Sequence, residues 1–198
     1  MKGITVNERK KVDRRHFISI AGAAATGIAL PKTAESAESS GTFKPLGPSD
    51  KVAVKGDPVK IAEEVGRLGA KYYGSRGGCA RCTVTALQDT LDFVPKDASL
   101  HRAGACLDSG STTTGLANCG AFTGGGMMFG FMAGGDDFGD TRIAHSLIRK
   151  LHKKYDDRYK SVLCRDVRKV NNGKCTITVG LASKWITEIL LEQFGEDA

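Results

Sequence analysis

Long apolar runs are absent from this sequence: none reaches the ~18 residues that a membrane-spanning helix needs. It also lacks CxxCH, the motif that attaches c-type haem. The triple glycine at 124–126 is not followed by Lys-Ser or Lys-Thr, so it is not the pattern of a phosphate loop. We therefore expect a mature protein with no membrane span and no covalent haem.

The net positive charge is small once the N-terminal segment is left out. Residues 1–37 carry seven of the 29 basic side chains and three of the 22 acidic ones, which accounts for more than half of the net charge of +7. The remaining chain has no basic stripe interleaved with aromatic residues. This composition predicts no nucleic-acid partner, and its 40% hydrophobic content is typical of a globular domain.

The first forty residues have the layout of a twin-arginine signal. Arg14 and Arg15 precede a mild apolar segment that ends at Leu30, and a polar stretch rich in small residues follows. We expect residues 1–40 to form this signal and a flexible lead-in, and residues 41–198 to form the exported domain. Since the twin-arginine pathway carries folded proteins, often with a cofactor already inserted, the predicted localisation is periplasmic or extracytoplasmic.

Apolar side chains recur at helical spacing through the rest of the chain, which predicts an all-α domain. We expect a compact bundle of about five helices: one starting at Asp57-Pro58, one from Cys79 to about Phe93, one within Thr114–Ala133, a long one capped by Asp140, and a last one through Leu181–Phe194. The third of these, Gly-rich and central, is apolar on every side and is therefore predicted to be buried. Residues 102–114 are predicted to form a loop, and Val52–Val54 and Thr176–Val179 are too short to predict a sheet.

Six cysteines are the main chemical feature of the chain: Cys79, Cys82, Cys106, Cys119, Cys164 and Cys175. An even number of cysteines in an exported protein first suggests disulfides. Against this, the chain is long enough to bury a core without covalent staples, and thiols stay reduced in the cytoplasm where a twin-arginine substrate folds. Lone buried cysteines are a further alternative, because free cysteine is often buried.

Glycines follow the thiol of Cys119 closely. Gly120 and Gly124 carry no side chains, so a neighbouring helix or a bulky group can come close to the backbone, and backbone N–H groups can then point at sulfur. Further along, Cys164 and Cys175 bracket a turn at 171–173. This turn brings the chain back and suits two thiols that converge on one site.

Four cysteine motifs follow one another in a set order over about residues 57–194. They are Cys79 in "GGCA", the block Cys119–Gly124 in "CGAFTG", Cys164 in "LCRD" and Cys175 in "GKC". This order resembles the C-GCAxxG-C-C family of bacterial and archaeal proteins, which is named for its cysteines and described as redox-active. The family name places Gly before the second cysteine, whereas Asn118 stands there in this chain.

The same module is similar to the iron–sulfur part of split-Soret cytochrome c, whose separate haem motif this chain lacks. The resemblance implies an electron-transfer protein rather than a catalyst, with no catalytic residue of its own. It implies an iron–sulfur cluster of the [2Fe–2S] type, with four ligands: Cys79, Cys119, Cys164 and Cys175. It also implies a redox partner protein and leaves a homodimer open as the assembly.

Two other functions stay open on the sequence alone. Cys79 and Cys82 form a CxxC on one helix face, with Arg76 and Arg81 nearby to activate a thiol, which suits a thiol–disulfide oxidoreductase. That enzyme needs Cys82 as its resolving thiol, whereas a cluster does not. Four cysteines also suit a structural zinc site, although the usual short CxxC pairs on both sides are missing. The sequence assigns no role to Cys106.

Overall fold

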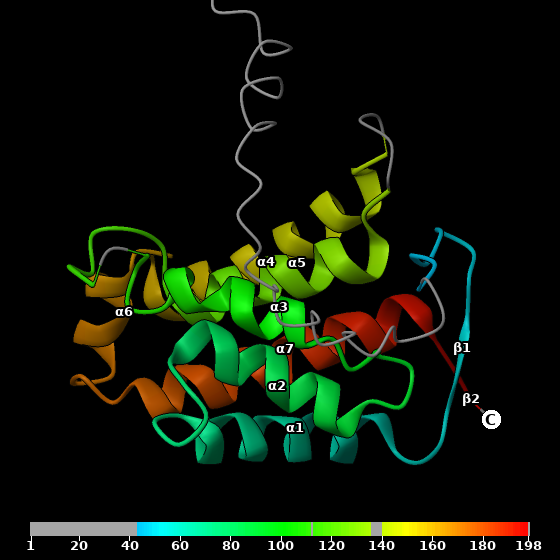
Figure 1. The fold of residues 1–198 in the computed structure, drawn as a ribbon, viewed down its shortest axis with the longest axis horizontal. Helices are drawn as coiled ribbons and strands as arrows, with labels where there is room; N and C mark the ends of the chain where they lie inside the picture. Colours follow the sequence, from blue (N-terminus) through cyan, green and yellow to red (C-terminus); the bar gives the residue numbers. More distant parts are fainter. Residues whose placement is uncertain (1–42, 112, 136–139, 198) are drawn as a thin grey trace, which may run out of the picture. The chain divides into compact units, whose positions relative to one another are not determined.

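The computed structural model describes residues 43–111, 113–135 and 140–197, which form a domain built almost entirely from helices (Figure 1). The helices within them are α1 (Pro58–Tyr72), α2 (Cys79–Thr90), α3 (Ala98–Ala103), the 3-10 helix η2 (Gly104–Leu107), α4 (Gly120–Ala133), α5 (Arg142–Tyr159), α6 (Cys164–Val170) and α7 (Cys175–Phe194). The predicted all-α fold is confirmed, with the short α3 and α6 in addition to the five helices expected. The predicted twin-arginine signal lies outside the described residues.

Two apolar helices, α4 and α7, form the centre of the domain. α7 packs against α1, α2, α4 and α5, and α4 packs against α2, α5 and α7. Most of α4 is buried, as its apolar composition predicts. Gly124 allows α4 to approach α2, because a β-carbon at this position would lie 2.8 Å from the carbonyl oxygen of Ala80.

The packed centre is made of large side chains from these central helices and their neighbours. Those that are fully buried include Leu87, Met128, Phe129, Met132, Leu147, Leu151, Tyr155, Ile186, Ile189, Leu190 and Phe194. Burial of one such side chain stabilises a fold by roughly 1.5–3 kcal/mol. The core therefore fixes the relative positions of α2, α4, α5 and α7, and with them the places where these helices begin.

Two predictions for the connecting segments are wrong. Val52–Val54 forms strand β1, which pairs in parallel with β2 (Gly195–Asp197). A segment this short predicts no sheet by itself, because its partner strand lies at the far end of the domain sequence. The predicted loop 102–114 begins with the end of α3 and with η2. Asp97 starts α3 by accepting a hydrogen bond from the N–H of Ser99 (2.6 Å).

Helix boundaries differ from the predictions by a few residues. α2 ends at Thr90, earlier than expected, and the N-cap of α5 is Thr141 rather than Asp140. Asp57 caps α1 as predicted, by accepting a hydrogen bond from the N–H of Val59 (2.8 Å). Within the described ranges, no helix has the length and apolar content to cross a membrane.

Candidate metal centre

Four cysteines from distant parts of the chain line one cavity of about 120 Å³: Cys79, Cys119, Cys164 and Cys175. In the sequence they are 40, 45 and 11 positions apart. The remaining lining residues are Tyr73, Ser109, Val167, Arg168 and Thr178. Three of the cysteines are buried, whereas Cys175 is partly exposed. Of the four cysteines, Cys175 is therefore the one nearest to solvent.

Each of these cysteines lies at the start of a helix. Cys79, Cys164 and Cys175 are the first residues of α2, α6 and α7, and Cys119 is the N-cap of α4. The N–H groups of a first turn have no partner inside the helix, and the helix dipole makes this end positive. Both effects favour a thiolate or another anion in the cavity. No acidic side chain of the described residues lines it.

Backbone pairing holds Cys119 beside Cys164. The N–H of Cys119 donates to the carbonyl oxygen of Val162 (2.7 Å), and the N–H of Cys164 donates to the carbonyl oxygen of Ala117 (2.9 Å). An antiparallel β-bridge lies between these two bonds. The segment that precedes α4 is thus tied to the segment that precedes α6, which places both thiols on the same cavity.

The turn between α6 and α7 brings Cys164 and Cys175 to one cavity, as its sequence predicts. Asn171 at the end of α6 is buried, and its side-chain amide donates to the hydroxyl oxygens of Thr178 (2.8 Å) and Tyr159 (3.1 Å). These bonds tie the end of α6 to the first turns of α7 and to the end of α5. They fix the direction in which the chain returns.

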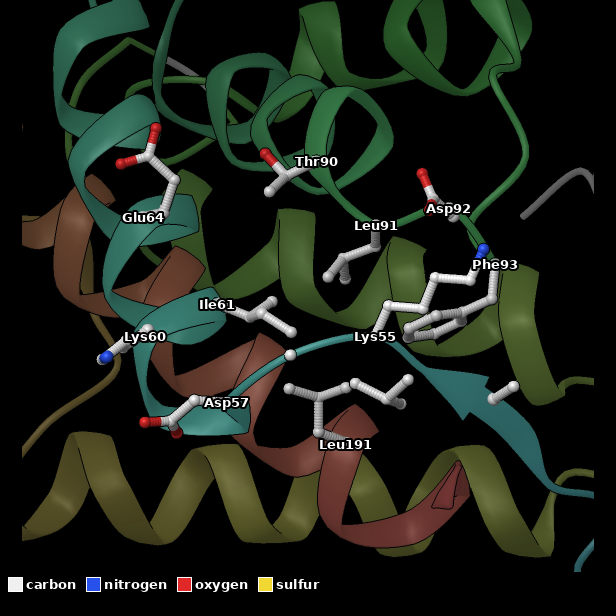
Figure 2. A pocket seen from close by; sticks show the side chains of 13 residues that line it. Lys55, Asp57, Lys60, Ile61, Glu64, Thr90, Leu91, Asp92, Phe93 and Leu191 are labelled. Carbon is white, nitrogen blue, oxygen red and sulfur yellow. The ribbon is translucent and has the colours of Figure 1, made fainter. Parts of the chain in front are cut away.

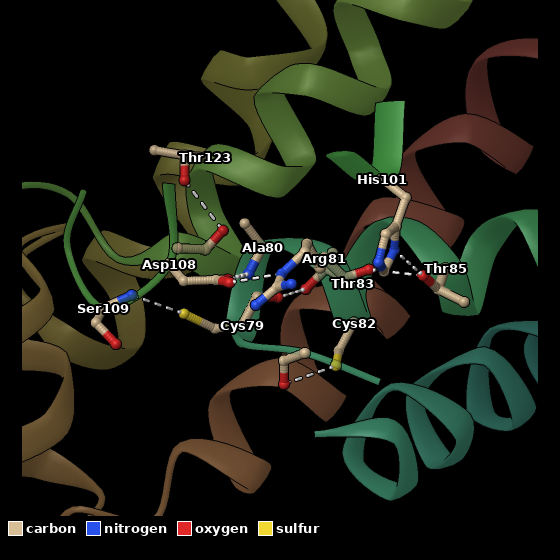
Figure 3. Close-up of polar contacts among 12 residues, drawn as sticks. Cys79, Ala80, Arg81, Cys82, Thr83, Thr85, His101, Asp108, Ser109 and Thr123 are labelled. Atoms are coloured by element: carbon tan, nitrogen blue, oxygen red, sulfur yellow. Dashed lines mark hydrogen bonds and ion pairs between the residues drawn. The ribbon is translucent and has the colours of Figure 1, made fainter. Parts of the chain in front are cut away.

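Asp108 holds the start of α2, and with it Cys79 (Figure 3). Its carboxylate accepts hydrogen bonds from the N–H of Ala80 (2.7 Å) and from Nε of Arg81 (2.9 Å). The next residue, Ser109, donates its N–H to the sulfur of Cys79 (3.4 Å). The loop after η2 therefore caps α2 and supplies a donor to a cavity sulfur, which no spacing in the sequence indicates.

Gly120, directly after Cys119, leaves room for the sulfur of Cys79. A β-carbon at Gly120 would collide with that sulfur and would lie 2.8 Å from the carbonyl oxygen of Leu107. The sequence predicts that glycine here lets a bulky group approach. The structure identifies the group that approaches Gly120 as a second thiol of the same cavity.

Two tyrosines place hydroxyl groups beside cavity sulfurs, and no motif in the sequence marks either of them for this role. Tyr155 of α5 is fully buried, its hydroxyl donates to the sulfur of Cys119 (3.8 Å), and its ring packs edge-on against Phe122. Tyr73 follows α1 and lines the cavity. Burial, and then a hydrogen bond with the thiol of Cys175, raises the pKa of Tyr73.

Burial controls the ionisation of the thiols. It raises the pKa of Cys79 and of Cys164, and together with the nearby Cys79 it raises the pKa of Cys119 to about 12. The N–H groups in the first turn of α4 and the hydroxyl of Tyr155 lower the pKa of Cys119, but more weakly. These three thiols therefore hold their protons at neutral pH, and a metal that bound them would have to displace these protons.

Cys82 and Cys106 lie outside the cavity. The thiol of Cys82 is buried and donates to the carbonyl oxygen of Gly77 (3.4 Å), and burial raises its pKa to about 11. In Figure 3 the sulfurs of Cys79 and Cys82 face different neighbours, Ser109 and the turn before α2. Cys106 is exposed on η2, and all six cysteines are free thiols rather than disulfides.

The donors and the cavity fit a metal group of several atoms. The volume of about 120 Å³ exceeds the roughly 10–15 Å³ that one water needs. No three Cys, His, Asp or Glu side chains of the described residues come together as a site for a metal ion. A [2Fe–2S] cluster divides four cysteines between two irons, so each iron needs two protein sulfurs rather than three or four. The cavity therefore offers four sulfur donors and room for a metal group of several atoms.

A larger cavity of about 340 Å³ lies near the opposite end of α7 (Figure 2). It is lined by β1, the start of α1, the end of α2 and Leu191 of α7. Ile61, Leu91 and Leu191 provide apolar walls, and side chains of both charge signs surround them. No cysteine lines this cavity. Although it is larger than the cysteine cavity, it has no thiol to bind a metal.

The fold and the smaller cavity together define a helical protein with a four-thiol site. Residues 78–189, more than half of the chain, match the family described as "Putative redox-active protein (C_GCAxxG_C_C)". The chain belongs to this family, which confirms the resemblance drawn from its cysteine motifs. Neither the curated proteins nor the solved structures gave a match.

Proposed function

We propose that this protein is an exported one-electron carrier that holds a [2Fe–2S] cluster through four cysteines: Cys79, Cys119, Cys164 and Cys175. One observation carries the proposal. These four thiols, distant in sequence, line one cavity. The redox-active family of the chain is in accord with it. A cluster of this type would supply a one-electron couple.

Groups of the chain itself would hold and tune this centre. The N–H of Ser109 and the hydroxyl of Tyr155 each donate to a cavity sulfur. Such donors stabilise the more negative, reduced form and therefore raise the reduction potential. The guanidinium of Arg168 and the four helix starts add positive potential. Three of the four sulfurs are buried, which keeps water away from them.

The geometry supports structural zinc less well. Zinc takes four ligands tetrahedrally, with sulfur at ~2.3 Å, so all four thiols would have to surround one point. Among the described residues no three ligand side chains do so.

The geometry also supports a thiol–disulfide oxidoreductase less well. That enzyme would pair Cys79 with Cys82, yet only Cys79 lines the cavity, and the thiol of Cys82 is buried and bonded to the carbonyl oxygen of Gly77. Burial raises the pKa of both thiols, whereas a reactive thiol needs a lowered pKa.

Export is part of the proposal, although its motif lies outside the described residues. Six free thiols are what folding in a reducing cytoplasm gives before transport. We expect the mature protein in the periplasm, together with a redox partner protein. Replacement of both Arg14 and Arg15 by Lys should retain the protein in the cytoplasm, which cell fractionation measures.

Metal analysis of protein purified without oxygen tests the cluster. We expect two irons and two acid-labile sulfides per chain, with charge-transfer bands in the visible spectrum. Cys119→Ser should abolish the bands. Cys106→Ser is the matched control and should keep them, because Cys106 is exposed and lies outside the cavity. One zinc per colourless chain, or a metal-free chain with a cycling Cys79–Cys82 disulfide, would overturn the proposal.

A further inference from the structure

The side of the cavity near Cys175 has an uneven distribution of charge. Segment 160–174, which contains α6 and ends just before Cys175, has five basic residues and one acidic residue. The acidic residue, Asp166, already has partners. Its carboxylate accepts a hydrogen bond from the hydroxyl of Ser161 (2.8 Å) and lies 3.5 Å from Nε of Arg165. The segment therefore presents a clear excess of positive charge.

Four cations of this segment are exposed and make no side-chain hydrogen bond or ion pair with the described residues: Lys160, Arg168, Lys169 and Lys174. Arg168 also lines the cavity, and its charge lowers the pKa of the Cys164 thiol against the stronger effect of burial. Lys174 is the residue before Cys175. Cations without partners thus lie at the cavity (Arg168) and next to its partly exposed cysteine (Lys174).

Exposed apolar side chains lie in this segment, at the start of α7, and beside Gly115, whose carbonyl oxygen accepts a hydrogen bond from the N–H of Arg165 (2.9 Å). Leu116, just before Cys119, is 62% exposed, Val170 at the end of α6 is 50% exposed, and Ile177 in the first turn of α7 is 40% exposed. They are three of the four large apolar side chains exposed in the described residues. Figure 1 shows α6 and the start of α7 at the same end of the domain. Apolar contacts within a polar surround are typical of protein–protein interfaces.

We propose that an acidic one-electron carrier protein docks on this surface. The surface, named here the cavity face, consists of Leu116, Arg165, Arg168, Lys169, Val170, Lys174 and Ile177. The choice of a redox carrier rests on the proposed function, whereas the choice of an acidic partner rests on the unpaired cations. Carboxylates of the carrier would pair with these cations and steer its approach. The carrier loses one electron and the metal centre gains it, with no bond or proton transferred.

The pattern of the cavity face favours a protein over other anionic partners. Nucleic-acid surfaces typically interleave cations with aromatic rings for stacking, but here the exposed apolar residues are Leu, Val and Ile. A membrane-surface helix needs a long amphipathic face, whereas α6 has seven residues. A folded partner protein can contact the apolar side chains of the cavity face with its own apolar surface and pair its carboxylates with the basic side chains.

Isothermal titration calorimetry of the full chain against flavodoxin, an acidic one-electron carrier, tests the proposal. A double variant, Lys169→Glu with Lys174→Glu, reverses two charges on the cavity face. The control, Lys55→Glu with Lys60→Glu, makes the same change in net charge beside the larger cavity (Figure 2). The 20 residues of α7 separate the two ends by about 30 Å. We expect Kd to rise about tenfold or more in the first variant and less than about twofold in the control.

Other outcomes would overturn the proposal that the carrier docks on the cavity face. They are an equal rise of Kd in both double variants, no binding of flavodoxin to the wild type, or tighter binding to phosphatidylglycerol vesicles than to flavodoxin. Circular dichroism checks folding, and the milder pair Lys169→Gln with Lys174→Gln should weaken binding in the same direction by a smaller factor. Added salt should weaken the wild type more than the face variant.

Iron content of the same samples separates the two proposals. A chain without iron that binds flavodoxin through the cavity face would overturn the cluster but support the docking surface. An iron-loaded chain that does not bind flavodoxin would do the reverse.

Discussion

Replacement of Gly120 by alanine should disturb the cysteine cavity and destabilise the fold. A β-carbon there would collide with the sulfur of Cys79 and lie 2.8 Å from the carbonyl oxygen of Leu107. The sulfur ends a side chain and can rotate, but the carbonyl oxygen belongs to the backbone and cannot. Overpacking of this kind costs about 1–3 kcal/mol. Alanine recovers at most ~1 kcal/mol through its higher helix propensity, so the free energy of unfolding should fall by about 1–2 kcal/mol.

Gly130 of the same helix provides the matched control. A β-carbon at Gly130 meets nothing within 4 Å, and the residue is exposed. Gly130→Ala should therefore raise the free energy of unfolding by about 0.5–1 kcal/mol, because glycine is the weaker helix former. Urea denaturation of metal-free protein, followed by circular dichroism, measures both changes.

The two glycine variants should also differ in metal content. Gly120→Ala displaces the sulfur of Cys79 and should lower the iron bound per chain, whereas Gly130→Ala should leave iron unchanged. If Gly120→Ala were as stable as Gly130→Ala and bound a full complement of iron, the close approach of α4 to Cys79 would be refuted.

Three further substitutions test the surroundings of the cavity. Tyr155→Phe keeps the ring but removes the hydrogen-bond donor to the Cys119 sulfur. Voltammetry should therefore show a lower reduction potential at unchanged iron content. An unchanged potential would contradict this hydrogen bond. Asp108→Ala removes the cap of α2 and the partner of Arg81, so urea denaturation should show a loss of about 1–2 kcal/mol, partly restored in Asp108→Asn. Cys82→Ser should keep its iron while losing about 1 kcal/mol of stability, and loss of iron would instead make Cys82 a ligand.

Local signals in the sequence predict the helices of this domain better than its sheet. Asp57 followed by proline predicts the start of α1 because capping needs only adjacent residues. Strand β1 depends on β2, which is distant in the chain, so no window around Val52–Val54 contains the reason for it. The sequence contains one signal for the start of α3, because Asp97 is a standard capping residue. The short segment after it, however, shows too little apolar periodicity to predict a helix.

The chemistry of the candidate site was predictable, but its geometry was not. Family resemblance indicates which cysteines belong together, whereas separations of 40 and 45 positions hold no information on convergence. The apolar stripe of α5 predicts that Tyr155 is buried, but not that its hydroxyl meets the sulfur of Cys119. Asp108 and Ser109 lie in a loop of small polar residues, whose path is set by contacts with α2 rather than by its own sequence.

The four cysteines of the cavity differ in their exposure, and this difference links the two proposed properties of the site, the docking of a carrier and the reduction potential. Three of its cysteines are no more than 7% exposed, whereas Cys175 is partly exposed and follows Lys174 of the cavity face. An electron from a docked carrier would reach Cys175 first, while the hydroxyl of Tyr155 acts on the buried sulfur of Cys119. Binding and potential should therefore respond to different residues. Substitution of Lys169, which does not line the cavity, should change the Kd of the carrier far more than the reduction potential, and Tyr155→Phe should do the opposite. If both substitutions changed both quantities together, the cavity would lack this separation.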